Sequence, residues 1–585
     1  MKRAATRLRG LLLGATCLLG AVATTEQAAL AAPPEASGYP ILDEKQLGQL
    51  NYIIQIASQA DGDFSNMLLL PGMKGADEHV RVQLAFMNYA LGAAVYNYTP
   101  AYRELGEQAS SNMLRKMIDY SAWGDIVRVS QGVAKFNPPE ILPLPTSYDP
   151  TAHFIMYSGH LFQMLAAHQM LFNDNRFSKP NSIRFQYPPT FNYPAEWTVT
   201  AGKAFTYDLG SLTKRIYGDF EHYGWRGDAC LPGAVFVLCN QQPMLGFKMY
   251  DHLYGTKYFT TASTQYKKVL AEENALDPKT KTWANFYSIH TKQWVQEPMG
   301  AVDGWAGAFM HAWDKAAIEA IYPTQRDYHI VTLPDGTATV KGDLEKELKS
   351  PHPVYSEDQG FMAVLAAEVG DAATKAKMLN YADKYYAPRW NGDAYYYPIA
   401  AEFRRADDAP NVWRRVQPLQ STSTFALARL LPKDGLYKMY NHPFTAKHFQ
   451  QPYVGNVTYP DVQVPRAVFD ETKNALVVTL RPGRTASTTA VRSWTFNNLD
   501  PKGSWAVWQD GRKLATLQAG AVKPAAGVTG LEMQGATTLK VSMPVAKETT
   551  FIVEGEKAGM PALKETAFMI ENDGKVLAKG TGGRR

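Results

Sequence analysis

The sequence predicts a mainly α-helical protein that ends in a smaller β-rich domain. From about residue 42 to residue 444, apolar residues recur at spacings of three and four, which is typical of helices packed on a core. After Pro443 the pattern alternates between apolar and polar residues, which is typical of strands. About a dozen helices in one run, with no fixed-length repeat, favour an α/α toroid or a helical array over a solenoid.

The expected helices are separated by short segments rich in Gly, Pro, Asn or Asp, as in Asn173-Asp174-Asn175. Each shows apolar residues on one face at helical spacing. The predicted segments are residues 47–60, 80–96, 110–120, 154–171, 207–222, 243–253, 261–272, 304–321, 358–369, 372–386 and 422–430.

The C-terminal part carries strand and hairpin signals. Asp510-Gly511 lies between two alternating segments, and this dipeptide is favoured in two-residue hairpin turns. We place a boundary near residues 446–456, with a helical domain over 40–445 and a β-sandwich-like domain over 456–585. The expected strands are residues 467–480, with a turn at 470–474, and 505–509, 512–517, 538–544 and 548–554.

The first 31 residues have the features of an export signal. Basic residues near Met1 precede an apolar run over residues 11–22, and Ala29-Leu30-Ala31 has the small-x-small pattern of a cleavage site. The run is too short to cross a bilayer, and no later segment supplies about 18 consecutive apolar residues. We therefore expect an exported protein, periplasmic or secreted, with a signal peptide over 1–31 and no membrane span.

The charge balance gives no indication of a nucleic acid or an anionic membrane as partner. The formal net charge is +5, and removing residues 1–31 takes away four basic residues and one acidic residue, which leaves +2. The chain has no runs of like charge. Its 32 tyrosines are numerous, and tyrosine is the aromatic residue that tolerates both burial and a wet pocket wall.

Cys230 and Cys239 are the only cysteines beyond the predicted signal, and two interpretations stay open. In an exported protein such a pair ordinarily forms a disulfide, which here would close a short loop and add about 2–3 kcal/mol. Alternatively, Cys239 precedes a helix start at Pro243, where the helix N-terminus would lower the thiol pKa and activate the sulfur. The chain has neither a Cys-x-x-Cys nor a His-Glu-x-x-His motif, so we expect no metal site.

His160 lies four residues after Met156 on one face of a predicted helix, and Gly159 permits a close approach there. A histidine on an apolar helix is more often a core residue with satisfied hydrogen bonds than a catalytic group. Three carboxylates next to aromatic residues leave a second class of enzyme open, in which paired carboxylates cleave glycans and the cysteines are structural. These carboxylates are Asp125, Asp303 and Glu357. A third alternative is a non-catalytic binding protein.

The residues around His160 and the two cysteines resemble the linalool dehydratase/isomerase family. The family pattern Ile-Met-Tyr-x-Gly-His-Leu is matched by Ile155–Leu161, and its pattern of Cys, eight residues and Cys-Asn is matched by Cys230–Asn240. Residues 122–125, 249–258 and 305–311 match in the same order. The resemblance covers roughly residues 45–440 and not the β-rich part.

The resemblance implies a cofactor-independent hydro-lyase or isomerase of an allylic, terpene-like alcohol. It implies an (α/α)6 barrel, assembly of several copies into a homo-oligomer, and catalysis by Cys230, Cys239 and His160. The substrate would be a small apolar alcohol or alkene. The expected substrate-binding residues are Met156, Tyr157, Phe236, Trp305 and Asp303.

Two family positions differ in this chain. The family's acidic residue on the first helix falls near Ala57, with Asp61 and Asp63 as candidate replacements. A family active-site tyrosine falls near Ala301, with Asp303 close by. Because dehydration needs an acid, a base and a dry pocket, these differences bear on which substrate is processed.

Overall fold

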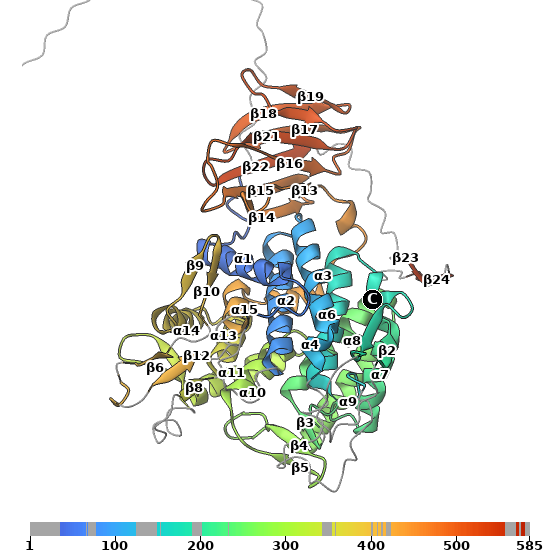
Figure 1. Cartoon of the computed structure of the whole chain (residues 1–585), viewed down its shortest axis with the longest axis vertical. Helices are drawn as coiled ribbons and strands as arrows, with labels where there is room; N and C mark the ends of the chain where they lie inside the picture. Colours follow the sequence, from blue (N-terminus) through green and yellow to red (C-terminus); the bar gives the residue numbers. More distant parts are fainter. Residues whose placement is uncertain are drawn as a thin grey trace, which may run out of the picture.

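The computed structural model confirms a helix-rich chain with a sheet-rich C-terminal region (Figure 1). The predicted signal, Asp125 and Glu357 lie outside the described residues. The structure describes residues 35–65, 67, 78–124, 149–152, 154–189, 202–231, 233–341, 354–356, 358–398, 402–405, 407–410, 413–416, 423–555, 569–572 and 575–579.

Apart from two short helices, at residues 120–123 and 435–441, which were not predicted, the helices agree with the predicted segments in place and type, and most bounds shift by only a few residues. Those of the described residues are α1 (Glu44–Ser58), α2 (Glu78–Tyr98), α3 (Glu104–Ile118), α4 (Tyr120–Trp123), α6 (Ile155–Phe172), α7 (Leu209–His222), α8 (Gln241–Tyr254), α9 (Tyr258–Glu272), α10 (Gly300–His311), α11 (Lys315–His329), α13 (Asp358–Val369), α14 (Ala372–Tyr385), α15 (Phe425–Leu430) and α16 (Gly435–Asn441).

One helix prediction is wrong, because residues 304–321 form the ends of two helices, α10 and α11, and not one helix. The chain leaves the helical path at Ala312, whose carbonyl oxygen accepts a hydrogen bond from Asn441 Nδ2 at 2.8 Å. Trp313 turns its Nε1 toward Gln241 Oε1 at 3.2 Å. These partners are distant in sequence, so apolar periodicity could not reveal the break.

The helix α6 is buried along nearly its whole length and packs against α2, α3, α7 and α8. Close approach to α8 depends on Gly159, since a Cβ there would lie 2.9 Å from Pro243 Cδ. A second close approach joins α10 to α13, where a Cβ on Gly304 would lie 2.6 Å from the Met362 backbone nitrogen. Both glycines lie beside predicted site residues, His160 and Trp305.

Several short strands connect the helices and were not predicted. The antiparallel sheet β3–β4–β5 consists of Ala234–Phe236, Phe286–Ser288 and Gln293–Val295, and β3 lies between the two cysteines. Strands of three or four residues give too little alternation for a sequence signal. The others in this part are β1 (Ile183–Gln186), β2 (Ala204–Tyr207), β6 (Ile330–Thr332), β7 (Ala338–Val340), β8 (Val354–Ser356), β9 (Arg389–Asn391), β10 (Ala394–Tyr396), β11 (Glu402–Phe403) and β12 (Arg414–Val416).

The C-terminal region contains two large antiparallel sheets, in the orders β13-β16-β21-β20 and β14-β15-β22-β17-β18-β19, besides the two-stranded sheet β23-β24. The two large sheets share a core that includes Trp494, Phe496 and Phe551. The Asp510-Gly511 hairpin is confirmed, with φ of 46° and 81° at these two residues. Bounds are β13 (Tyr453–Gly455), β14 (Val462–Asp470), β15 (Ala475–Pro482), β16 (Val491–Asn497), β17 (Ser504–Gln509), β18 (Arg512–Gln518), β19 (Ala521–Pro524), β20 (Leu531–Met533), β21 (Leu539–Pro544), β22 (Thr549–Gly555), β23 (Met569–Asn572) and β24 (Lys575–Lys579).

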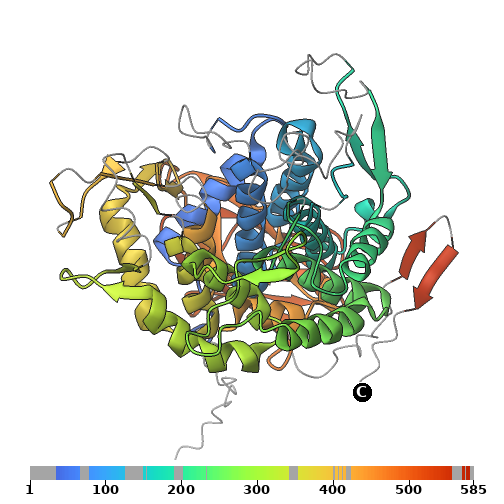
Figure 2. The same cartoon turned by 90° about the horizontal axis from the view of Figure 1, so that it is seen from below.

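The two sheets pack on the end of the helical part formed by α1, α2 and α3, as Figure 1 shows. The Ala101 backbone nitrogen donates to the Ala467 carbonyl at 3.0 Å across this contact. Figure 2 views the helices from the end opposite to the sheets. A closed toroid stays a prediction. Among the helices that the structure describes, none has the length and hydropathy needed to cross a bilayer.

Candidate functional site

Cys230 and Cys239 lie side by side in the interior. Their Sγ atoms are 2.7 Å apart, both are free thiols, and their exposed fractions are 0% and 1%. The chain turns back between them, because the Cys230 backbone nitrogen donates to the Ala234 carbonyl at 2.9 Å. Strand β3 then leads into a 3-10 turn over Leu238–Asn240 that carries Cys239. The structure therefore pairs the two thiols without joining them in a disulfide.

Asn240 holds the loop of Cys230 in place. Its Oδ1 accepts from the Asp228 backbone nitrogen at 2.8 Å, and its Nδ2 donates to the Asp228 carbonyl at 3.0 Å. Gly227, with φ of 100°, lies so close that a Cβ would be 2.3 Å from the Asn240 side chain. The amide thus connects the loop before Cys230 to the turn that carries Cys239.

The thiol of Cys239 keeps its proton. Burial, together with the hydrogen bond to Cys230, raises the pKa of Cys239 well above its usual range. The expected lowering by a helix N-terminus is therefore wrong, since loss of hydration outweighs the helix dipole. A raised pKa makes the thiol a weaker acid and makes its thiolate, once formed, a stronger base.

His160 offers one ring nitrogen to the interior. Its Nδ1 lies 2.7 Å from Tyr89 Oη, while its Nε2 is buried and has no hydrogen-bond partner among the described residues. Burial, reinforced by the nearby charge of Arg81, lowers the pKa of His160 to about 3. The imidazole is therefore neutral near pH 7. Nε2 donates or accepts according to the tautomer that Tyr89 selects.

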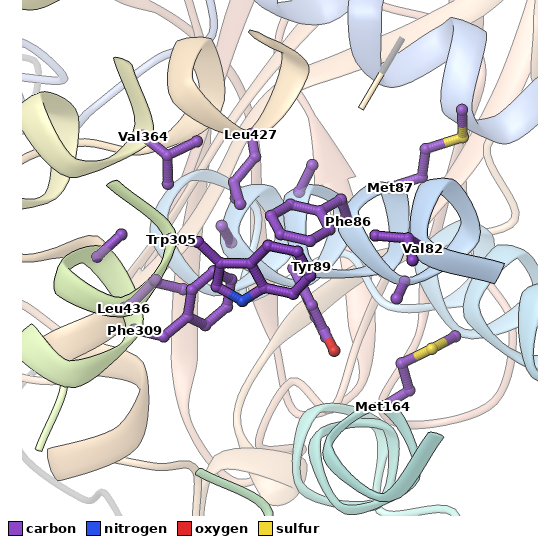
Figure 3. Close-up of a cluster of buried hydrophobic side chains, with 14 of the residues drawn as sticks. Val82, Phe86, Met87, Tyr89, Met164, Trp305, Phe309, Val364, Leu427 and Leu436 are labelled. Carbon is purple, nitrogen blue, oxygen red and sulfur yellow. The ribbon is translucent and has the colours of Figure 1, made fainter. Parts of the chain in front are cut away.

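Aromatic rings surround His160. The Trp305 ring centroid is 5.4 Å from that of His160, and Phe86 lies 6.0 Å from it. Trp305 stacks on Phe361 at 5.1 Å, and Phe86 meets Trp305 edge to face at 5.0 Å. Figure 3 shows Phe86 and Tyr89 of α2 beside Trp305 of α10. Ring faces of this kind can stabilise positive charge in a site without water.

The imidazole and the thiol pair lie on neighbouring turns. The Ile155 backbone nitrogen at the start of α6 donates to the carbonyl of Ala229, directly before Cys230, at 2.9 Å. Gly159, next to His160, meets Pro243, four residues after Cys239. The α10 helix of Trp305 also contacts the turn of Cys239. The structure thus brings three predicted catalytic residues and Trp305 to one region of the core.

The other predicted substrate-binding residues have different surroundings. Met156 and Phe236 are half-buried, and the Phe236 ring lies 5.3 Å from Phe286 in the β3–β4 sheet. Tyr157 is fully buried, but its hydroxyl donates to the Met117 carbonyl at 2.6 Å. The Tyr157 hydroxyl therefore already has a hydrogen-bond acceptor in the backbone of α3.

Asp303 is also engaged by neighbours. Its Oδ1 accepts from the Trp283 backbone nitrogen at 2.8 Å, and its Oδ2 lies 2.6 Å from His329 Nε2. Burial raises the pKa of Asp303, while the contact with His329 acts in the opposite direction. This carboxylate joins α10 to α11.

The two candidate replacements for the family's first-helix acid lie outside the core. Asp61 pairs with Arg115 Nε at 3.3 Å, and 41% of its side chain is exposed. Asp63 accepts from the Ser65 backbone nitrogen at 3.0 Å, a hydrogen bond that lowers the pKa of Asp63. Ala57 itself is fully buried. Both carboxylates are thus engaged by neighbours other than His160 and the thiols.

Sequence reasoning missed Tyr89 and Gln242. Tyr89 is fully enclosed, and burial raises the pKa of its phenol well above 10, so the hydroxyl keeps its proton. Gln242 is fully buried, and both ends of its amide have no partner among the described residues. Tyr89 is 71 residues from His160, so no spacing could connect them. The two consecutive glutamines directly after Cys239-Asn240 were the sequence feature that could have indicated Gln242 as a site residue.

The family model described as linalool dehydratase/isomerase matches residues 81–403. This segment contains Cys230, Cys239 and His160, and it ends before the two C-terminal sheets.

Solved structures give weaker similarities. An α-mannanase of glycoside hydrolase family 76 from Bacteroides thetaiotaomicron is 10% identical, with a TM-score of 0.36, over 68% of this chain and 100% of its own. Dfg5 from Chaetomium thermophilum, in complex with glucosamine, is 11% identical, with a TM-score of 0.37, over 69% and 93%. The endoglucanase CelQ from Clostridium thermocellum is 10% identical, with a TM-score of 0.32, over 88% and 93%. At these scores the likeness identifies neither a fold nor a substrate.

Proposed function

Because the chain belongs to the linalool dehydratase/isomerase family, we propose that it is a cofactor-independent hydro-lyase or isomerase of an unsaturated, mostly apolar alcohol. One observation carries the proposal. Two free thiols, Cys230 and Cys239, are buried with their sulfurs 2.7 Å apart, on turns next to a neutral imidazole that has a free nitrogen.

The thiol pair supplies the proton transfers. One thiol donates its proton to the leaving hydroxyl, the carbon–oxygen bond breaks, and water departs. The resulting thiolate removes a proton from the carbon next to the allylic cation, which yields the alkene and restores the thiol. For isomerisation, water instead adds to the far end of the allyl system and gives a proton to the thiolate, which yields the isomeric alcohol and restores the thiol. Because the raised pKa of Cys239 makes its thiolate strongly basic, the transfer of a proton back to that thiolate is favourable.

His160 orients the substrate in this proposal. Since its pKa is about 3, it is not the acid near pH 7, and Nε2 acts by hydrogen bonding to the hydroxyl or to the leaving water. Trp305 and Phe86 line the hydrocarbon side, and their ring faces stabilise the cation. Low local dielectric strengthens the attraction between the cation and the thiolate.

Three further features belong to the proposal. The helical part closes into an (α/α)6 barrel, several copies assemble into a homo-oligomer, and the protein is exported after removal of residues 1–31. Export makes the redox state of the thiols decisive, since an oxidising compartment would convert the pair into a disulfide.

The first experiment measures that redox state. Protein purified from its exported location is alkylated without prior reduction and analysed by mass spectrometry, in parallel with turnover of allylic alcohols. We expect two alkylated cysteines, with activity lost on alkylation. A complete disulfide that leaves activity unchanged would refute the proposal and return attention to a glycan-active enzyme. Loss of Asp303 should then abolish activity, whereas replacement of the thiols should not.

A further inference from the structure

A second polar cluster, which contains neither cysteine, lies at the break between α10 and α11. His311 ends α10, Glu319 lies on α11, and Asp434 precedes α16. His311 Nε2 is 3.7 Å from Glu319 Oε1 and 3.9 Å from Asp434 Oδ1. One ligand atom from each residue lies within 4.8 Å of the others. Three potential metal ligands of two helices and a loop therefore converge.

His311 is held so that one nitrogen faces the two carboxylates. Its Nδ1 is 3.1 Å from Glu368 Oε1, and Glu368 in turn accepts from the backbone nitrogens of Leu436 and Tyr437 at 2.8 Å. The ring is fully buried, and Nε2 has no hydrogen-bond partner among the described residues. A carboxylate on one nitrogen, with the other nitrogen left free, is the arrangement that surrounds histidine ligands of metals.

A cation already occupies the rim of this cluster. Lys315 Nζ lies 2.7 Å from Asp434 Oδ1 and 3.7 Å from Glu319 Oε1. The two carboxylates therefore face a positive charge even without an ion.

We propose that His311, Glu319 and Asp434 bind a divalent transition-metal ion, Zn²⁺ in the first place, and that Lys315 neutralises the carboxylates in its absence. Zinc takes imidazole nitrogen and carboxylate oxygen at about 2.0–2.2 Å, so tetrahedral ligand atoms lie about 3.3–3.6 Å apart. The two spacings from His311, 3.7 and 3.9 Å, need to close by only a few tenths of an ångström, and all three ligand atoms lie within 4.8 Å of one another. Glu319, whose side chain is 43% exposed, leaves an entry path and room for a water ligand.

This site goes beyond the proposed reaction. The ion would connect α10, α11 and the loop before α16, which meet where α10 ends and α11 begins. Its expected effect is on stability, since a ligand that binds only the folded state shifts the unfolding equilibrium. Turnover by the thiol pair does not depend on it.

The test uses the full-length protein, stripped with a chelator, and titrates Zn²⁺ by calorimetry and Co²⁺ by absorption. Glu319→Gln should weaken Zn²⁺ binding at least about tenfold, because a ligand is lost. Lys315→Met should tighten it at least about fivefold, because a positive charge about 4 Å from the ion is removed. Glu272→Gln is the matched control, since Glu272 also pairs with a lysine four residues earlier on its helix, at 3.9 Å.

The colour of the cobalt complex separates this site from the thiols. Sulfur ligands give Co²⁺ an intense near-ultraviolet charge-transfer band, which nitrogen and oxygen ligands do not. We expect no such band from the first equivalent, and a rise in thermal midpoint with Zn²⁺ that Glu319→Gln diminishes. A sulfur band at one equivalent, or equal affinities for Glu319→Gln and Glu272→Gln, would overturn the proposal. Asp434→Asn, which tolerates the left-handed backbone at φ of 59°, is a second loss-of-ligand variant.

Discussion

Two histidines on α6, two turns apart, have nearly the same surroundings and different hydrogen bonding. His160 and His168 are each 1% exposed, and each places Nδ1 against a hydroxyl, Tyr89 at 2.7 Å and Ser110 at 3.0 Å. Aromatic rings lie beside both. His168 Nε2 is 3.0 Å from Asp174 Oδ2, whereas His160 Nε2 has no hydrogen-bond partner among the described residues.

We propose that this difference separates a structural histidine, His168, from a functional one, His160. Burial and apolar neighbours do not distinguish them, since both rings lie in the core. A core histidine normally satisfies both nitrogens, because an unpaired buried polar atom costs about 1–3 kcal/mol. His160 keeps an unpaired buried nitrogen near the thiol pair. The end of α6 that carries His160 is therefore the candidate site.

The largest expected loss of turnover comes from substitution of the two cysteines, which lie near the His160 end of α6. Cys230→Ser and Cys239→Ser should each lower turnover of an allylic alcohol by about 10²–10⁴-fold, because a hydroxyl cannot replace a thiol in proton transfer. Rates are compared with circular dichroism to show that the fold survives. Val237→Ala, a buried change on the same loop without an ionisable group, is the control. Full activity in either cysteine variant would contradict the assignment.

The histidine comparison itself is tested by paired substitutions. His160→Asn should lower kcat/KM about 10²-fold, because substrate loses the Nε2 contact. His168→Asn should leave kcat/KM within about threefold but lower the free energy of unfolding by about 1–3 kcal/mol, since Asp174 loses its partner. Rates and urea unfolding are measured for both. Equal losses of activity would show that the free nitrogen has no special role.

The tyrosine that contacts His160 provides a smaller effect. Tyr89→Phe should lower kcat about tenfold, because Nδ1 loses the hydroxyl that sets the tautomer. Tyr157→Phe removes a hydroxyl bonded to the Met117 carbonyl and should cost about 1 kcal/mol of stability with less than a twofold change in kcat. If Tyr157→Phe proves the more damaging to kcat, then the Tyr157 hydroxyl contacts substrate after all.

The pH dependence of stability sharpens the same comparison. Burial lowers the pKa of folded His160 to about 3 from about 6.5 in the unfolded chain, so the unfolded state binds more protons between these values. The stability that neutral His160 contributes is complete above about pH 6.5 and is lost as pH falls toward 3, by at most about 1.4 kcal/mol per pH unit.

The measurement is urea unfolding from pH 7 to pH 4 for the wild type and for His160→Asn. Burial also lowers the pKa of His448 to about 3, so the slope of the wild type contains that contribution. The difference between the two proteins isolates His160, and the variant should have the shallower slope. Parallel slopes would show that His160 is not held neutral.

Much of the fold was predictable because it depends on local patterns. The bounds of α13 equal the predicted residues 358–369, and α6 differs by one residue at each end. The hairpin at Asp510-Gly511 follows from two residues that adopt positive φ. The break at Ala312 was missed, because it depends on Asn441, 129 residues away.

The sequence by itself determined the helix-rich and sheet-rich parts, the two cysteines and the motif around His160, because composition, periodicity and short motifs are local properties. Only the tertiary structure decided what these residues can do. It paired the sulfurs, placed Tyr89 on His160, and directed Asp303 to His329. It also reversed the expected pKa shift of Cys239, because an ionisable group responds to its burial and to distant neighbours more than to its place in the chain.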